Sequence, residues 1–98
     1  MGREVWYNVA MIAYLLYNRQ TPAEARVNDL ARELAALDTQ TELLDADSPR
    51  GVQLAEHYDV MGRPAVVLMR EDDGSPTQVW QGEDQWPTAD EVSYLAHQ

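Results

Sequence analysis

The chain has 98 residues, and its composition excludes several classes of function. This length predicts one domain spanning residues 1–98, with a core at roughly 9–97, and the hydrophobic content of 45 % is sufficient for such a core. Seventeen acidic side chains against seven arginines give a formal charge of −10, so we expect neither nucleic acid nor a membrane as partner. The absence of cysteine excludes disulfides, thiolate metal sites and thiol chemistry.

The N-terminal third contains the longest apolar run, residues 9–16. This run is far shorter than the ~20 residues that span a bilayer, and no cleavage site of the small-x-small type follows it. We therefore expect a cytoplasmic protein.

Residues 9–17 are apolar on both faces of an extended chain, which predicts a central strand buried on both sides. A buried helix is the alternative for this run, because its alanine and leucine residues tolerate helix. After it, Thr21, Pro22 and Glu24 occupy the N-cap, first helical and capping-box positions of a helix start. Apolar residues then recur at helical spacing up to Leu37, which predicts an amphipathic helix.

The second half of the chain alternates strand and helix signals. We predict a strand at 41–46, a helix from Ser48 to about residue 58, and strands at 65–69 and 77–81 that form a hairpin. Thr88 and Glu91 form a second capping box, which opens the last helix. The predicted order is β-α-β-α-β-β-α.

This order resembles that of the thioredoxin-like family, and four groups of residues carry the resemblance. They are residues 44–47 (LDAD) followed by 54–60 (LAEHYDV), residues 62–65 (GRPA), the glycine pair Gly74 and Gly82, and Pro87 with Thr88. The resemblance implies an α/β, three-layer fold with a mixed central sheet. It also implies a cis proline at Pro64, whereas a trans proline at the start of a strand is the ordinary alternative.

The chemistry of that family is missing from the sequence. Aligning Pro22 with the proline of the Cys-Gly-Pro-Cys motif places residues 20–23 (QTPA) on the motif, so both sulfurs are absent. The same register puts Arg19 at the usual tryptophan and Tyr14 at the proton-relay aspartate. Few residues precede the first core strand, so the resemblance implies a truncated form of the fold. Because both sulfurs are absent, it also implies a redox-inactive form without thiol–disulfide activity.

The former active surface is the candidate binding site. The resemblance implies that the residue before the cis proline, Arg63, pairs its main chain with an extended peptide. We therefore expect a groove that binds a peptide or an anion without chemistry, formed by Arg19, Gln20, Thr21, Pro22, Arg63 and Pro64. The alternative is that both arginines pair with nearby carboxylates on a solvated surface and that Thr21 is only a helix cap.

The most direct interpretation is a non-catalytic module that binds a protein or peptide, with no catalytic residue, cofactor or metal. One alternative is an enzyme of the glutathione-transferase type, in which Tyr17 or Thr21 activates the thiol of glutathione. Another is a structural domain that self-associates through Trp6 and Tyr7 or through its acidic last third. The histidines, His57 and His97, lack metal-ligand spacing, and Glu56 beside His57 on a helix forms no acid–base pair.

Overall fold

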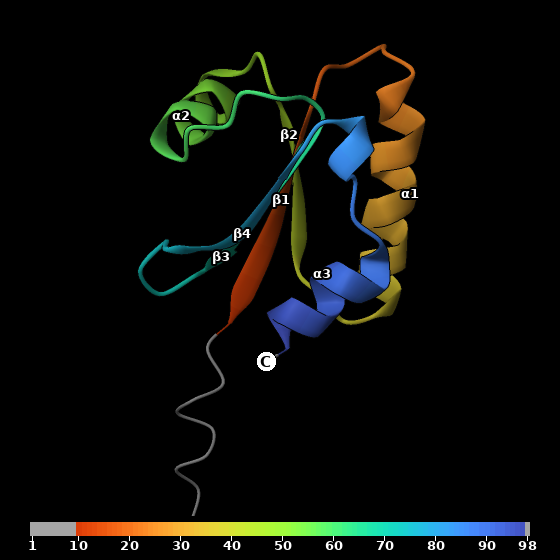
Figure 1. The fold of residues 1–98 in the computed structure, drawn as a ribbon, viewed down its shortest axis with the longest axis vertical. Helices are drawn as coiled ribbons and strands as arrows, with labels where there is room; N and C mark the ends of the chain where they lie inside the picture. Colours follow the sequence, from red (N-terminus) through yellow and green to blue (C-terminus); the bar gives the residue numbers. More distant parts are fainter. Residues whose placement is uncertain (1–9, 98) are drawn as a thin grey trace, which may run out of the picture.

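A computed structural model describes residues 10–97 of the chain (Figure 1). Its elements, in chain order, are β1 (Met11–Tyr17), α1 (Ala23–Ala36), β2 (Thr41–Asp45), α2 (Pro49–His57), β3 (Ala65–Arg70), β4 (Pro76–Gln81), the 3-10 turn η2 (Glu83–Gln85) and α3 (Ala89–Ala96). This is the predicted order of strands and helices with one addition, the short turn η2, which had no sequence signal.

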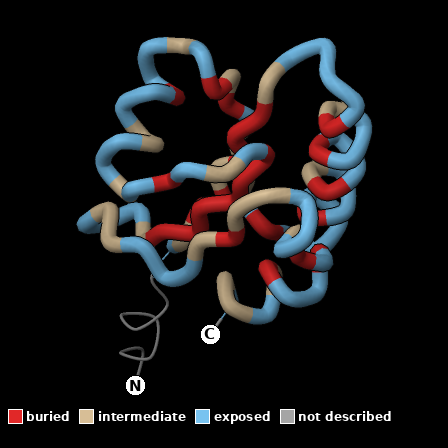
Figure 2. Tube along the Cα trace, turned by 45° about the horizontal axis from the view of Figure 1, so that its top comes forward, coloured by how far each residue is buried: buried red, intermediate tan, exposed pale blue. Residues whose placement is uncertain are grey.

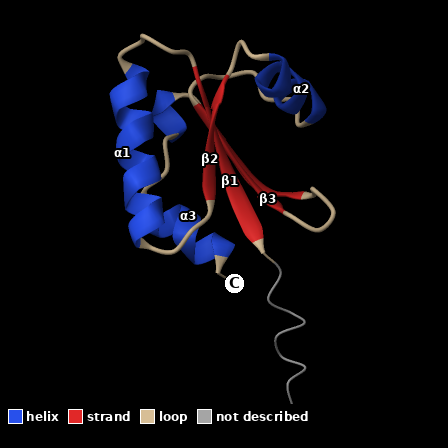
Figure 3. Cartoon of the chain, turned by 180° about the vertical axis from the view of Figure 1, so that it is seen from behind, coloured by secondary structure: helices blue, strands red, loops and turns tan. Residues whose placement is uncertain are grey.

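The four strands form one mixed sheet in the order β2-β1-β3-β4. Strand β1 is parallel to β2 and antiparallel to β3, and β3 is antiparallel to β4. Helices α1 and α3 cover one face of this sheet, and α2 lies on the other (Figure 3). The predicted three-layer α/β fold with a mixed sheet is therefore confirmed.

The side chains of β1 alternate between two cores, one on each face of the sheet. Ala13, Leu15 and Tyr17 pack into the core beneath α1 and α3, whereas Ile12 and Leu16 pack into the core on the α2 face. Figure 2 shows these buried stretches gathered along the strands at the centre of the molecule. The prediction of a strand buried on both sides is confirmed, and the helical alternative for this run is wrong. Val9 lies outside the described residues.

The predicted capping role of Thr21 is wrong. Helix α1 begins one residue later than expected, at Ala23, after Pro22, and no side chain caps it. Gln20 has a positive φ of 61°, which turns the chain so that the Thr21 hydroxyl donates to the Asn18 carbonyl at 2.7 Å. The first turn is closed instead by the main chain, because the Glu24 N–H donates to the Thr21 carbonyl at 3.0 Å.

The other two predicted helix starts are confirmed. The hydroxyl of Ser48 accepts a hydrogen bond from the Gly51 N–H at the start of α2. At the start of α3, the Thr88 hydroxyl accepts from the Glu91 N–H and the Glu91 carboxylate accepts from the Thr88 N–H, both at 3.1 Å. These reciprocal bonds are the capping box that the sequence indicated.

Candidate functional site

The candidate site lies where β1 ends and β3 begins. Leu16 pairs with Ala65 in the antiparallel register of these strands, so the residues after β1 and those before β3 meet at one edge of the sheet. The start of α1 borders the same edge, at the top of Figure 1. Segments that are more than forty residues apart in the sequence are therefore brought together by strand pairing alone.

A small cavity of about 190 Å³ opens at this edge. Four of the six predicted groove residues line it, namely Thr21, Pro22, Arg63 and Pro64. Arg19 and Gln20 are not part of its lining. The sequence interpretation missed three lining residues: Asn18, Ala23 and Glu83. Asn18 had one available signal, because it directly follows the first core strand.

The main chain on one side of the cavity is partly unpaired. The peptide bond between Arg63 and Pro64 is cis, and the Pro64 carbonyl accepts a hydrogen bond from the Gly82 N–H at 2.8 Å. Within residues 10–97, neither the N–H nor the carbonyl of Arg63 has a hydrogen-bond partner. Arg63 is an exposed residue, and the rest of the described chain leaves both of these main-chain groups without a partner.

The arginines around the cavity are each close to a carboxylate. Arg19 lies 3.6 Å from Asp45, and Arg26, which extends from α1, lies 3.9 Å from Glu83. Arg63 lies 3.6 Å from the Asp47 carboxylate. The positive charge expected for an anion site is therefore balanced by acidic side chains, as in the solvated-surface alternative.

Of the two side chains considered for thiol activation, one is buried and the other already makes a hydrogen bond. Tyr17 is only 9 % exposed and belongs to the core beneath α1 and α3. The Thr21 hydroxyl lines the cavity, but its proton is donated to the Asn18 carbonyl. Tyr17 is therefore buried away from the cavity, and the Thr21 hydroxyl could donate to a bound thiolate only by giving up its bond to Asn18.

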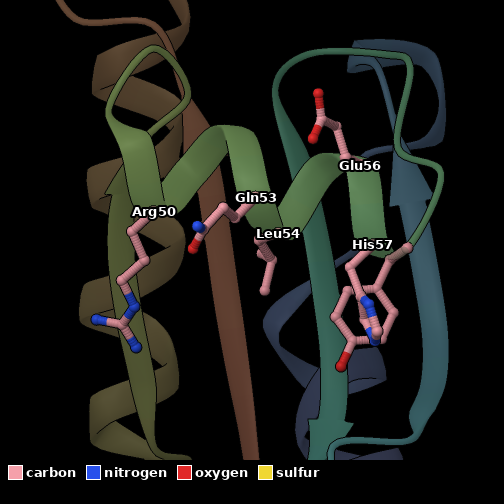
Figure 4. Close-up of a pocket in the computed structure, with 6 residues that line it drawn as sticks. Arg50, Gln53, Leu54, Glu56 and His57 are labelled. Carbon is pink, nitrogen blue, oxygen red and sulfur yellow. The ribbon is translucent and has the colours of Figure 1, made fainter.

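A larger, more open cavity of about 660 Å³ lies beside α2, on the face of the sheet that α1 and α3 do not cover (Figure 4). Its lining includes Arg50, Leu54 and His57. Glu56 points away from His57 in this view, which agrees with the expectation that they form no acid–base pair. The His57 ring instead meets the Tyr58 ring edge-on, with 4.6 Å between the ring centres.

The chain matches no model of a known protein family and no curated protein. Several solved structures match it, including thioredoxins. A mutant thioredoxin from Halobacterium salinarum is 21 % identical with a TM-score of 0.69, and the match covers 95 % of this chain and 77 % of that one. The chain has the thioredoxin-like fold. For a thioredoxin from Fasciola hepatica the identity is 17 % and the TM-score 0.64, with 98 % and 89 % of the two chains covered. The thioredoxin from Thermus thermophilus is 22 % identical with a TM-score of 0.58, covering 88 % and 71 %.

The sequence-based resemblance is thus confirmed at the level of the fold. A thioredoxin-like fold without cysteine cannot exchange disulfides, because that reaction requires a thiolate. No group of three or more acidic, histidine or cysteine side chains within residues 10–97 is placed to hold a metal ion. In the same range, no helix has the length and apolar character to cross a membrane.

Proposed function

We propose that this chain is a non-catalytic interaction module whose cavity, beside the Arg63 main chain, binds an extended segment of a partner protein. The supporting observation is that Arg63 lines the cavity and that its N–H and carbonyl have no hydrogen-bond partner within residues 10–97. Adjacent donor and acceptor groups of this kind pair with an extended peptide in the manner of an added strand. Thr21 and Pro22 on the opposite side of the cavity would contact the peptide's side chains.

The charges around the cavity favour a neutral or basic segment over an anion. Arg19, Arg26 and Arg63 each face a carboxylate, so an incoming anion would have to displace an existing partner. The formal charge of −10 also attracts cations over the whole molecule. The expected ligand is therefore a neutral or basic peptide, and an anion is disfavoured.

A titration followed by amide NMR shifts tests the proposal. The probes are three synthetic hexapeptides that differ at two positions of one strand-forming sequence. These two positions hold neutral residues in the first peptide, arginines in the second and glutamates in the third. We expect saturable shifts at Asn18, Thr21 and Arg63, tightest with the arginine peptide and weakest with the glutamate peptide. Saturable shifts confined to other regions, or none at all, would refute the proposal.

A matched pair of variants separates the cavity from the general surface. Thr21→Trp places a large side chain at the cavity, and Thr77→Trp places the same side chain at an exposed position on β4. We expect Thr21→Trp to abolish the shifts at Arg63 and Thr77→Trp to preserve them. Equal effects of the two variants would contradict binding in the cavity.

A further inference from the structure

Gln81 is the last residue of β4, and its side chain turns toward the segment that precedes Pro64. Its carboxamide oxygen accepts two main-chain hydrogen bonds, from the Met61 N–H at 2.7 Å and from the Gly62 N–H at 2.9 Å. Two N–H donors on one oxygen also fix which end of the amide faces the loop. One side chain thus holds two successive peptide groups.

Within residues 10–97, the main chain from Met61 to Arg63 has no other hydrogen bonds. At its start, the Val60 N–H bonds to the Ala55 carbonyl of α2, and at its end the Pro64 carbonyl bonds to the Gly82 N–H. Between these points, the bonds to Gln81 are the only hydrogen bonds that the main chain of residues 61–63 makes within residues 10–97. The exposure of Met61, 82 %, shows that packing of its side chain does not hold the loop.

Close packing of the same loop supports this arrangement. A Cβ atom added to Gly62 would lie 3.1 Å from the Gln81 Cβ and 3.2 Å from the Gly82 nitrogen. The loop therefore passes directly against the end of β4, which brings its N–H groups within reach of the Gln81 carboxamide. Gln81 is itself held, because its N–H donates to the Gln85 side chain at 3.1 Å.

We infer that Gln81 is a positioning residue, which fixes the loop of residues 61–63 so that the open peptide groups of Arg63 face a bound segment. The second part of this inference rests on the proposed function, whereas the first part stands on the loop alone. The Met61 and Gly62 N–H groups are bonded to Gln81, so the next N–H in the chain, that of Arg63, is the first without a partner within residues 10–97.

Three variants test the inference. Gln81→Met keeps the length of the side chain but removes the acceptor, and Gln81→Glu retains an acceptor for both N–H groups. Gln78→Met is the matched control, because Gln78 is exposed on the same strand. The first measurement is amide hydrogen exchange in the full chain without ligand. The second is the dissociation constant of the neutral hexapeptide, which the added charge of Gln81→Glu does not itself attract.

In Gln81→Met we expect exchange at Met61 and Gly62 to accelerate roughly tenfold, the order of effect of one lost hydrogen bond, with no change at amides of β1. Gln81→Glu should restore protection, and Gln78→Met should leave it at the wild-type level. Unchanged exchange at Met61 and Gly62 in Gln81→Met would overturn the role of Gln81 in fixing the loop.

The binding measurement decides the second part. We expect the dissociation constant to rise about tenfold in Gln81→Met and to recover in Gln81→Glu, a rescue that a general loss of stability would not produce. If exchange responds as expected but binding does not, the positioning role in recognition is refuted. If the wild-type chain binds no peptide, the proposed function fails, and the exchange data still decide whether Gln81 holds the loop.

Discussion

The Asp47 carboxylate joins the two sides of the cavity, because one of its oxygens lies 3.6 Å from the Arg63 guanidinium and the other accepts a hydrogen bond from the Asn18 side chain at 2.9 Å. Asn18 follows β1, and Arg63 precedes β3. A single acidic residue from the loop between β2 and α2 therefore neutralises the one arginine that lines the cavity within residues 10–97.

Removing this charge should convert the cavity into a better anion site. In Asp47→Asn the Arg63 guanidinium loses its carboxylate partner, so we expect sulfate or the glutamate hexapeptide to bind about two- to fivefold more tightly, the range of an exposed ion pair. The measurement is an NMR titration at low salt. Asp84→Asn, an equal change of charge at an exposed position on η2, is the control, and an equal gain there would show that net charge alone is responsible.

Helix caps give a second prediction, on the free energy of unfolding in urea. Thr88→Ala removes the hydroxyl of a complete capping box and should destabilise the chain by about 1 kcal/mol. Thr21→Ala removes an exposed hydroxyl that bonds only to the Asn18 carbonyl, so its cost should be less than half as large. A larger loss for Thr21→Ala would mean that Thr21 caps α1 after all.

The contrast between these threonines shows what the sequence can predict. Each threonine has a glutamate three residues later, at the position that a capping box requires, but only Thr88 forms the box. Around Thr21 the deciding feature is the positive φ of Gln20, a backbone conformation for which glutamine gives no signal. Strands and helices with strong apolar periodicity were predictable because their signal is local.

The composition of the cavity depends on contacts that are distant in sequence. Glu83 reaches the cavity from the 3-10 turn, and Gln81 reaches Met61 across twenty positions of the sequence. No local pattern of apolar or capping residues marks such polar contacts, since they depend on the pairing of β3 with β4. The family resemblance located Arg63 and Pro64, but it could not indicate that each arginine nearby would face a carboxylate.

Close packing of Gly51 gives a third prediction. This glycine is in the first turn of α2, and a Cβ atom there would overlap the Asp45 carbonyl at the end of β2. Gly51→Ala should therefore destabilise the chain by about 1–3 kcal/mol, although alanine is the better helix former. Val52→Ala, at the neighbouring and partly exposed position, is the control for the helix itself. An increase in the urea midpoint of Gly51→Ala would contradict the tight contact.

The last prediction concerns alkaline pH. Burial raises the pKa of the Tyr58 phenol above its ordinary value, and the charges of Tyr14 and Asp73 raise it further. The neutral hydroxyl donates a hydrogen bond to the Gly74 carbonyl, which links α2 to the β3–β4 turn. Because the folded state disfavours ionisation, this contribution to stability is fully present below pH ~10 and is lost as the pH rises through the pKa of the folded state.

Tyr58→Phe measures this contribution directly. Near pH 8 the variant should be less stable than the wild type by about 1 kcal/mol, the ordinary worth of one hydrogen bond. Between pH 9 and 11, approximately the range of tyrosine ionisation, the difference in unfolding free energy should shrink, because only the wild type has this phenol to ionise. Tyr94→Phe, at a residue that is 68 % exposed, controls for the loss of a phenol on the surface. A difference for Tyr58→Phe that stays constant over this pH range would show that the phenol is not held in its neutral form by the fold.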